Sequence, residues 1–192
     1  NPTLTVHLIF TDSQNYLGYS TKLAERKRPK KVFKSPSELH WKLGRAMVNL
    51  AGLNEKEVLC DPFCGTGTIL LEAESMGIKS IGIDYDKRMC EGAKKNLAAN
   101  GYNSRIINAE YDHIQKIKDG VDGIVTDLPY GISSKSSESP RKLIRDFMSI
   151  LPKKKKLAIM CKKDLADQIE LKPAKKYEIY RHKSLTRTIL VK

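Results

Sequence analysis

One stretch, residues 58–68, constrains the fold of this chain more than any other part of it. An apolar run ends there on Asp61, and Pro62 then excludes further ladder pairing. Gly65 and Gly67 permit a tight turn, after which apolar residues recur at helical spacing. A strand, a glycine turn and a helix in this order predict the first half of a Rossmann-type βαβ unit.

Two features indicate which ligand this βαβ unit binds: the acidic end of the next strand, and the absence of a third glycine from the turn. Residues 81–83 form a second apolar run that ends on Asp84, where such folds bind the two hydroxyls of a ribose. The dinucleotide fingerprint requires a third glycine, and Leu70 stands at that position. Asp61 would repel a phosphate but favours a cationic ligand. We therefore predict S-adenosylmethionine, which has a ribose, an ammonium, a sulfonium and no phosphate; a tight turn without a ligand is the alternative.

The charge of the chain points to a polyanionic partner. Its 35 lysines and arginines face 22 acidic residues, a formal net charge of +13. Such an excess attracts nucleic acid by steering and by counterion release. A solvated lysine-rich surface, as in heat-stable proteins, is the alternative.

Neither a membrane nor a metal is expected as a partner. No apolar window is long enough to span a bilayer, and the first residues do not resemble a signal peptide. The four cysteines fall on predicted strand, turn and helix positions, so we expect reduced thiols in a cytoplasmic protein. No second Cys/His pair is spaced to complete a zinc site.

The N-terminal part of the chain differs in composition from the rest. Residues 3–10 and 16–19 predict the two strands of a hairpin, and the basic stretch 22–34 has the composition of a linker that favours nucleic acid. We interpret residues 1–34 as a hairpin and linker, and residues 35–192 as a folded domain. The chain does not begin with methionine, so we expect a domain excised from a longer protein.

The predicted domain alternates strands and helices. Its first helix is expected to begin with Ser35 as N-cap and Glu38 in a capping box, and to end at Gly52. The further strands and helices expected along the chain are strands at 105–107, 123–126 and 157–160 and helices at 87–100, 140–151 and 164–171. Residues 177–181 and 186–191 predict an antiparallel terminal hairpin. The fold class is therefore α/β, Rossmann-like, with a mostly parallel sheet of the seven-stranded type.

Acidic side chains follow several of these strands. They are Asp61, Asp84, Glu110 and Asp127. Ligands of open α/β sheets bind at the carboxyl ends of the strands, so we expect all four to face one crevice. This convergence predicts an active site.

The residues after the fourth strand of the domain suit chemistry on an amine. A purine amine is a poor nucleophile, and an enzyme must hold its two hydrogens so that the lone pair faces the incoming methyl group. Asp127 can accept one hydrogen and the carbonyl of Leu128 the other, while Pro129 stiffens the turn. Tyr130 offers a face on which the base can stack. We predict these four as catalytic residues.

The motifs at 61–67 and 127–131 resemble those of class I methyltransferases that modify exocyclic amines. With the stretches 27–36, 43–50 and 184–187 added, the chain from about residue 22 onward is similar to the catalytic domain of archaeal tRNA guanine-N2 methyltransferases acting on guanosine 10. That family carries an N-terminal THUMP domain that docks the tRNA and is missing from this sequence.

The resemblance implies a role for each matching residue. Asp61, Gly65 and Gly67 would hold the methionine part of the cofactor, with Thr66 and Tyr85 in the same site. Asp84 would bind the ribose, Glu110 and the Tyr111 amide the adenine, and Asp127 the target amine. Leu128 departs from the family, in which many members have a second proline, and so leaves the modified position of the tRNA open.

The sequence therefore predicts methyl transfer to the N2 amine of a tRNA guanosine, with position 10 as first choice. One alternative is an amino-methyltransferase for another tRNA guanosine, for DNA adenine or cytosine, or for a protein glutamine. The basic linker and the stretch 184–187 argue for RNA, and the net charge argues against a protein substrate. The other alternative is a non-catalytic RNA-binding module, which would not need Asp84 and Asp127 together. The number of methyl groups and the oligomeric state stay open.

Overall fold

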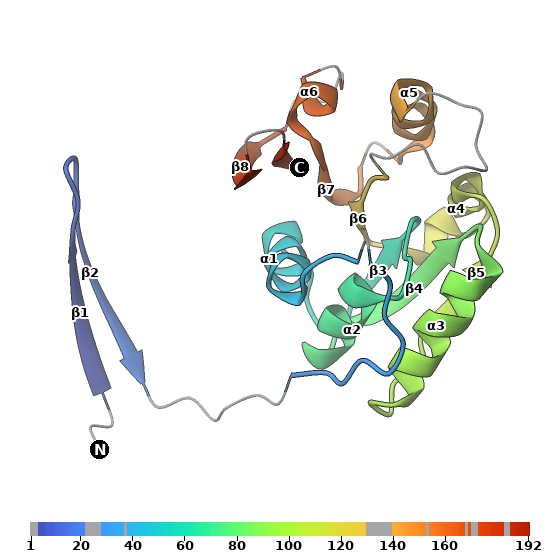
Figure 1. Ribbon diagram of the computed structural model, residues 1–192, viewed down its shortest axis with the longest axis horizontal. Coiled ribbons are helices and arrows are strands. Elements are labelled where there is room, and N and C mark those ends of the chain that lie inside the picture. The colour runs from blue at the N-terminus through green and yellow to red at the C-terminus, as the bar shows by residue number, and fades with distance from the viewer. Residues whose placement is uncertain are drawn as a thin grey trace.

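The computed structural model describes residues 4–21, 28–36, 38–129, 140–152, 154–167, 169, 173–182 and 185–192. Within them lie a two-stranded hairpin and a seven-stranded sheet with helices on both faces (Figure 1). The strands of the large sheet are β3 (Val58–Asp61), β4 (Lys79–Asp84), β5 (Arg105–Asn108), β6 (Gly123–Asp127), β7 (Lys156–Lys162), β8 (Lys175–His182) and β9 (Leu185–Val191).

The order of strands across the large sheet is β5-β4-β3-β6-β7-β9-β8. Strands β3 to β7 pair in parallel, and β9 then pairs antiparallel with both β7 and β8. The predicted fold class is thereby confirmed, including the antiparallel hairpin at the C-terminus. After β5 the chain returns to the middle of the sheet and adds β6 on the other side of β3, so the strand order reverses between β3 and β6. Such folds bind their ligands at this point.

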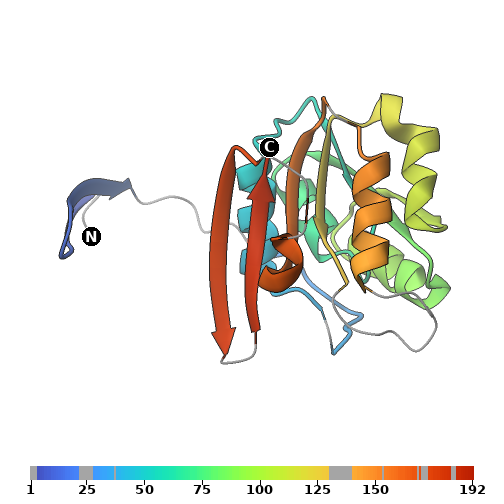
Figure 2. The same cartoon turned by 90° about the horizontal axis from the view of Figure 1, so that it is seen from above.

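Helices lie on both faces of the large sheet (Figure 2), and each face carries a hydrophobic core. On one face pack α1 (Trp41–Ala51), α2 (Thr68–Ser75) and α3 (Lys87–Ala98). On the other face pack α4 (Ile114–Ile117), α5 (Pro140–Ile150) and α6 (Lys163–Ala166). Two short 3-10 turns that the sequence did not predict flank α4, at Tyr111–His113 and Lys118–Gly120. No helix in the described part of the chain has the length and apolar character needed to cross a bilayer.

Helix α1 begins later than predicted. His40 caps it, because its Nδ1 accepts the Lys42 amide hydrogen at 3.3 Å. The Glu38 carboxylate does accept from the Ser35 amide at 3.4 Å, as a capping box requires, but the two residues form only an isolated turn. Glu38 also binds Lys31 at 2.8 Å, and this tertiary contact holds it away from a helical path. The predicted start at Ser35 is therefore wrong, whereas the predicted end at Gly52 is confirmed.

The N-terminal hairpin consists of β1 (Leu4–Phe10) and β2 (Asn15–Thr21), as predicted. It stands apart from the rest of the molecule in Figure 1. Every residue of β1 is exposed, and Leu17 on β2 is 75% exposed.

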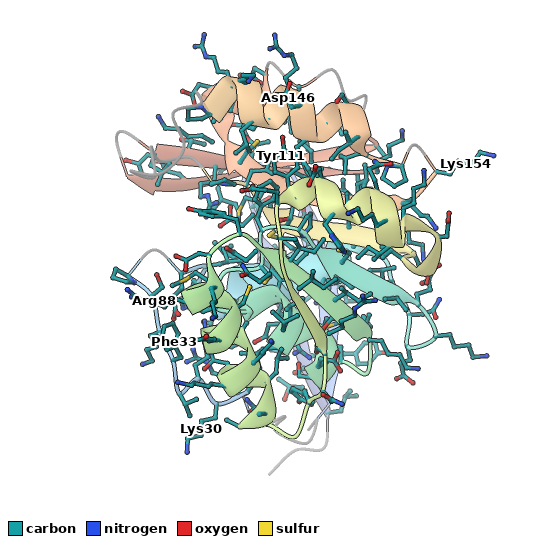
Figure 3. All side chains as sticks on the ribbon, turned by 90° about the vertical axis from the view of Figure 1, so that its right-hand side faces the viewer. Lys30, Phe33, Arg88, Tyr111, Asp146 and Lys154 are labelled. Atoms are coloured by element: carbon teal, nitrogen blue, oxygen red, sulfur yellow. The ribbon has the colours of Figure 1, made fainter. Side chains whose placement is uncertain are left out.

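A strap, residues 30–34, runs across α3 although its composition predicts a linker. The Val32 and Phe33 amides both donate to Oδ1 of Asn96, at 2.9 and 2.8 Å, and Asn96 Nδ2 returns a bond to the Phe33 carbonyl at 2.8 Å. Figure 3 shows Phe33 beside α3. The contact there is close, because a Cβ added to Gly92 would lie 2.3 Å from the Phe33 ring. The predicted linker therefore contains a segment that packs on the folded domain.

Candidate active site

A cavity of about 390 Å³ opens at the carboxyl ends of β3, β4 and β6, beside the point where the strand order reverses. Most of the residues predicted for the site line it. These are Asp61, Gly65, Thr66, Asp84, Tyr85, Asp127, Leu128 and Pro129. Parallel strands end at one edge of the sheet, so side chains far apart in the sequence meet there.

The glycine turn that follows β3 forms one wall of the cavity. Gly65 and Gly67 have φ values of 51° and 80°, in the left-handed region that side-chain-bearing residues rarely adopt. Gly67 precedes the first residue of α2 and is not among the residues that line the cavity. The Cys64 amide donates to the Ile83 carbonyl at 2.9 Å, which fixes the turn against the end of β4.

Asp84 is held at the tip of β4 by two backbone amides. Its Oδ2 accepts from Gly65 at 2.8 Å and its Oδ1 from Asp86 at 2.9 Å. Burial raises the pKa of Asp84, and these two hydrogen bonds oppose the rise. A carboxylate has about four acceptor positions, so both oxygens can still accept from a pair of hydroxyls.

Asp61 is 2% exposed at the end of β3. Its Oδ1 accepts from the Thr126 hydroxyl at 2.6 Å and from the Phe63 amide at 3.1 Å. Burial raises the pKa of Asp61 to about 7; these two hydrogen bonds oppose the rise, and the nearby negative charges of Asp127 and Asp84 add to it to a smaller extent. A cationic ligand in the cavity would therefore stabilise the ionised carboxylate.

Asp127, at the end of β6, has a charged partner. The Arg187 guanidinium, from β9, forms an ion pair with its Oδ1. Burial raises the pKa of Asp127 to about 6, and the charge and hydrogen bond of Arg187 oppose that rise. Arg187 belongs to the stretch 184–187, which argues for RNA in the sequence, and it is 5% exposed and contacts Asp127 in the site.

The turn after Asp127 is anchored at its first residue. The Leu128 amide donates to the Met160 carbonyl at 2.8 Å, and the Leu128 side chain is fully buried. Pro129 is exposed and lines the cavity. Tyr130, the fourth residue predicted for catalysis, lies outside the described residues.

The two residues predicted for adenine lie beyond this cavity. Glu110 is exposed and Tyr111 is half-buried, and neither is among the lining residues. The Tyr111 ring stacks on Phe63, which does line the cavity, with 5.4 Å between ring centroids and 27° between planes. Both aromatic rings pack edge-on against Phe147 of α5. The structure thus connects Tyr111 to the cavity through Phe63.

Sequence reasoning missed a buried polar cluster behind the glycine turn. Lys31 of the strap is 7% exposed, and its Nζ donates at 2.8 Å to Glu38, Thr66 and Thr68. Burial lowers the pKa of Lys31, and Glu38 opposes that effect. Lys31 stands in a run of basic residues, so nothing local in the sequence distinguishes it from its solvated neighbours. Asn96 reinforces the cluster by donating from Nδ2 to the Thr66 carbonyl at 2.9 Å.

Within the described ranges, no group of three or more His, Cys, Asp and Glu side chains is placed to hold a metal ion. The four cysteines are buried and form no disulfide.

Residues 28–188 of the chain match the family described as RMKL-like, methyltransferase domain. The tRNA (guanine(10)-N2)-dimethyltransferase of Methanothermobacter thermautotrophicus is 38% identical over 172 residues, covering 84% of this chain and 51% of that protein. A probable tRNA (guanine(10)-N2)-dimethyltransferase of Methanothermococcus thermolithotrophicus is 38% identical over 158 residues, covering 78% of this chain and 96% of that protein. The chain thus spans about half of the first relative and nearly all of the second.

Among solved structures, TrmN from Thermus thermophilus has the same fold. The two superimpose with a TM-score of 0.68 at 21% identity, covering all of this chain and 60% of that one.

Proposed function

This chain belongs to the RMKL-like methyltransferase domain family, and we propose that it transfers a methyl group from S-adenosylmethionine to the N2 amine of a guanosine in tRNA. The modified residue we propose is guanosine 10, the position named for the archaeal relatives. The observation that carries the proposal is the meeting of three carboxylates, Asp61, Asp84 and Asp127, around one cavity at the switch point of the sheet.

The residues present suit this cofactor. Asp84 presents two fixed carboxylate oxygens to the ribose hydroxyls. Asp61, buried without a cationic partner among the donors given above, suits the ammonium of the methionine part, next to Gly65 and Thr66. S-adenosylmethionine brings a methyl group already activated on a sulfonium, so no metal is needed to activate it.

The adenine is assigned to the outer end of the cavity. Tyr85 lines the cavity beside Asp84 and is 48% exposed, as suits a side chain that covers a flat ring. We keep Glu110 and the Tyr111 amide as partners for the edge of the adenine, since Tyr111 stacks on the cavity residue Phe63.

Asp127 and its turn act on the target amine. The Asp127 carboxylate accepts one amine hydrogen and the Leu128 carbonyl the other, which directs the nitrogen lone pair at the methyl group. Pro129 limits the motion of this turn, and Tyr130 stacks on the base. Once the nitrogen carries the methyl group, its surplus proton passes to Asp127 or to water.

The partner is assigned as tRNA on the charge of the chain and the names of its relatives. The excess of 35 basic over 22 acidic residues favours a polyanion. We place the protein in the cytoplasm, where tRNA is available and buried thiols such as Cys60 and Cys64 stay reduced. We place a tRNA-docking THUMP-type domain in the half of the Methanothermobacter thermautotrophicus relative that this chain does not span.

Mass spectrometry of nucleosides tests the proposal. The whole protein is incubated with S-adenosylmethionine and with unmodified tRNA transcripts, one of normal sequence and one with adenosine at position 10. We expect N2-methylated or N2,N2-dimethylated guanosine in the first and none in the second. Methylation that survives the change at position 10 would move the target to another guanosine, and N6-methyladenosine would refute the guanine assignment.

A further inference from the structure

Arg187 and Asp127 meet across an intervening strand. Asp127 on β6 pairs in register with Met160 on β7, which in turn pairs with Ile189 on β9. Arg187 precedes Ile189 by two residues, and Asp127 follows Val125 by two. Side chains two residues apart in a strand point to the same face, and Val125, Met160 and Ile189 share the core that α1 covers. The Arg187 guanidinium therefore reaches over β7 on that face to contact Asp127.

This ion pair is set apart from solvent on the side away from the cavity. The Arg187 side chain is 6% exposed and that of Asp127 is 18% exposed. Asp127 lines the cavity whereas Arg187 does not. The guanidinium is therefore placed behind the carboxylate, and a bound substrate meets Asp127 first.

The contact is also specific to one oxygen of the carboxylate. Arg187 donates from Nη2 to Oδ1 of Asp127. Because Oδ1 is held in this way, the direction in which Oδ2 points is also fixed. An ionised carboxylate only accepts hydrogen bonds, whereas a protonated one donates from one of its oxygens. A site that must hold an N–H group needs the acceptor, and a permanently charged arginine favours that form.

We propose that Arg187 is a positioning residue for the methyl transfer: by occupying Oδ1 of Asp127 it keeps the carboxylate ionised and directs Oδ2 at a hydrogen of the target amine. The inference rests on the proposed function and extends it, because it explains why the site selects an amine. A carbonyl oxygen at the same place would meet an acceptor and be rejected.

The charged neighbours of Asp127 make this role necessary. Among the described residues, Asp61 on β3 adds a second carboxylate to the cavity, and Cys161 lies on the adjacent strand β7. Burial raises the pKa of Cys161 to about 12, so this thiol stays neutral. Asp84 contributes a further negative charge near Asp61. Arg187 is thus the cation that offsets the burial of Asp127.

Removing the cation has a defined effect on the pH dependence. The active form of Asp127 is ionised, so turnover falls as the pH decreases through its pKa, which is about 6 with Arg187 in place. Without Arg187, burial favours the protonated form unopposed, and the pKa of Asp127 rises. A neighbouring opposite charge changes an aspartate pKa by roughly 1–3 units, so the acidic limb should move to higher pH by about that amount.

Arg187→Met, Arg187→Lys and Arg45→Met in the whole protein test the role. Arg45 is the matched control, because it pairs with the buried Glu72 at 3.0 Å between α1 and α2, away from Asp127. We expect Arg187→Met to lose roughly twofold to a hundredfold in single-turnover rate at pH 7, according to the size of the pKa shift, and to regain most of it by pH 9. Arg187→Lys should keep the acidic limb near pH 6, and Arg45→Met should lower the melting temperature without moving the limb. A rate loss in Arg187→Met that is the same at every pH would show a purely structural role and overturn the proposal.

A titration independent of activity separates this inference from the proposed function. The carboxyl ¹³C signal of Asp127, identified by its loss in Asp127→Asn, is followed by NMR in the wild type and in Arg187→Met. An upward movement of its midpoint in Arg187→Met is expected even if no RNA is methylated, in which case the proposed function fails and the effect of Arg187 on Asp127 stands. An unchanged midpoint would overturn the role of Arg187 whatever the substrate.

Discussion

The two sides of the cavity stabilise their carboxylates in different ways. On the cofactor side, Asp84 is held by two backbone amides and Asp61 by a hydroxyl and an amide, all of them neutral donors. On the other side, Asp127 has the guanidinium of Arg187. Burial raises the pKa of all three acids, but only for Asp127 does a buried cation oppose it.

The difference matches the charges of the proposed ligands. S-adenosylmethionine carries its own positive charges, so it can supply the counter-charge for Asp61 when it binds. The amine of guanine is neutral, and Asp127 must be ionised before the base arrives. Of the three carboxylates, the one that receives a cationic partner from the described part of the chain is therefore the one whose proposed ligand brings no charge.

Of the substitutions that test the difference between the two sides of the cavity, Asp127→Asn should have the largest effect. The amide keeps the shape of the side chain but loses the charge that orients the amine, and losses of general acid–base groups cost about 10²-fold or more in rate. We expect single-turnover methylation to fall by that factor while cofactor affinity measured by calorimetry stays nearly unchanged. A collapse of cofactor binding would instead assign Asp127 to the cofactor side.

A smaller effect is expected from Asp84→Ala on the other side. Removing the carboxylate deletes both proposed ribose hydrogen bonds, and bonds to a charged group contribute roughly 1.5–3 kcal/mol each. Affinity for S-adenosylmethionine should weaken about tenfold or more in calorimetry. Asp86→Ala is the control, because the Asp86 side chain caps α3 through the Arg88 amide at 2.8 Å, while its backbone amide, which holds Asp84, is kept in the alanine variant. Equal affinity in Asp84→Ala and Asp86→Ala would refute the ribose assignment.

The smallest effect is expected on stability, from Asp61→Asn. The pKa of Asp61 in the folded protein is about 7 and its ordinary value is 3.8, so the folded state binds more protons between these values. Stability of the ligand-free protein should therefore fall as the pH rises from about 4 to 7, and stay low above it.

Asparagine cannot ionise but keeps an oxygen that can accept from Thr126 and Phe63. Asp61→Asn should accordingly stabilise the ligand-free protein at pH 8 by on the order of 1 kcal/mol or more. Differential scanning calorimetry at pH 5 and pH 8 measures this, and we expect a smaller difference between the two melting temperatures than in the wild type. A difference as large as in the wild type would show that Asp61 is not the group responsible.

The fold could be predicted from the sequence because its signals are local. Apolar runs, the glycines at 65 and 67 and the acids at strand ends each reflect the conformation of their own segment. The same reasoning placed Asp61, Asp84 and Asp127 together, since parallel strands end at one edge.

What the sequence did not reveal depends on contacts between distant residues. Arg187 and Asp127 are 60 positions apart, and Lys31 and Thr66 are 35 apart. Propensity and spacing carry no information on which lysine of a basic run becomes buried. The early start predicted for α1 failed for the same reason, because Glu38 is engaged by Lys31.

The strap restricts how this domain can vary in evolution. Asn96 is fully buried and uses both ends of its amide, accepting from the strap and donating to Phe33 and to Thr66 of the glycine turn. Aspartate would set a negative oxygen against those two carbonyls, and alanine would leave buried amides and carbonyls without partners. The Asn96 side chain therefore couples the strap, whose composition resembles that of a linker, to the glycine turn of the cofactor site. A substitution in either segment must remain compatible with this one asparagine.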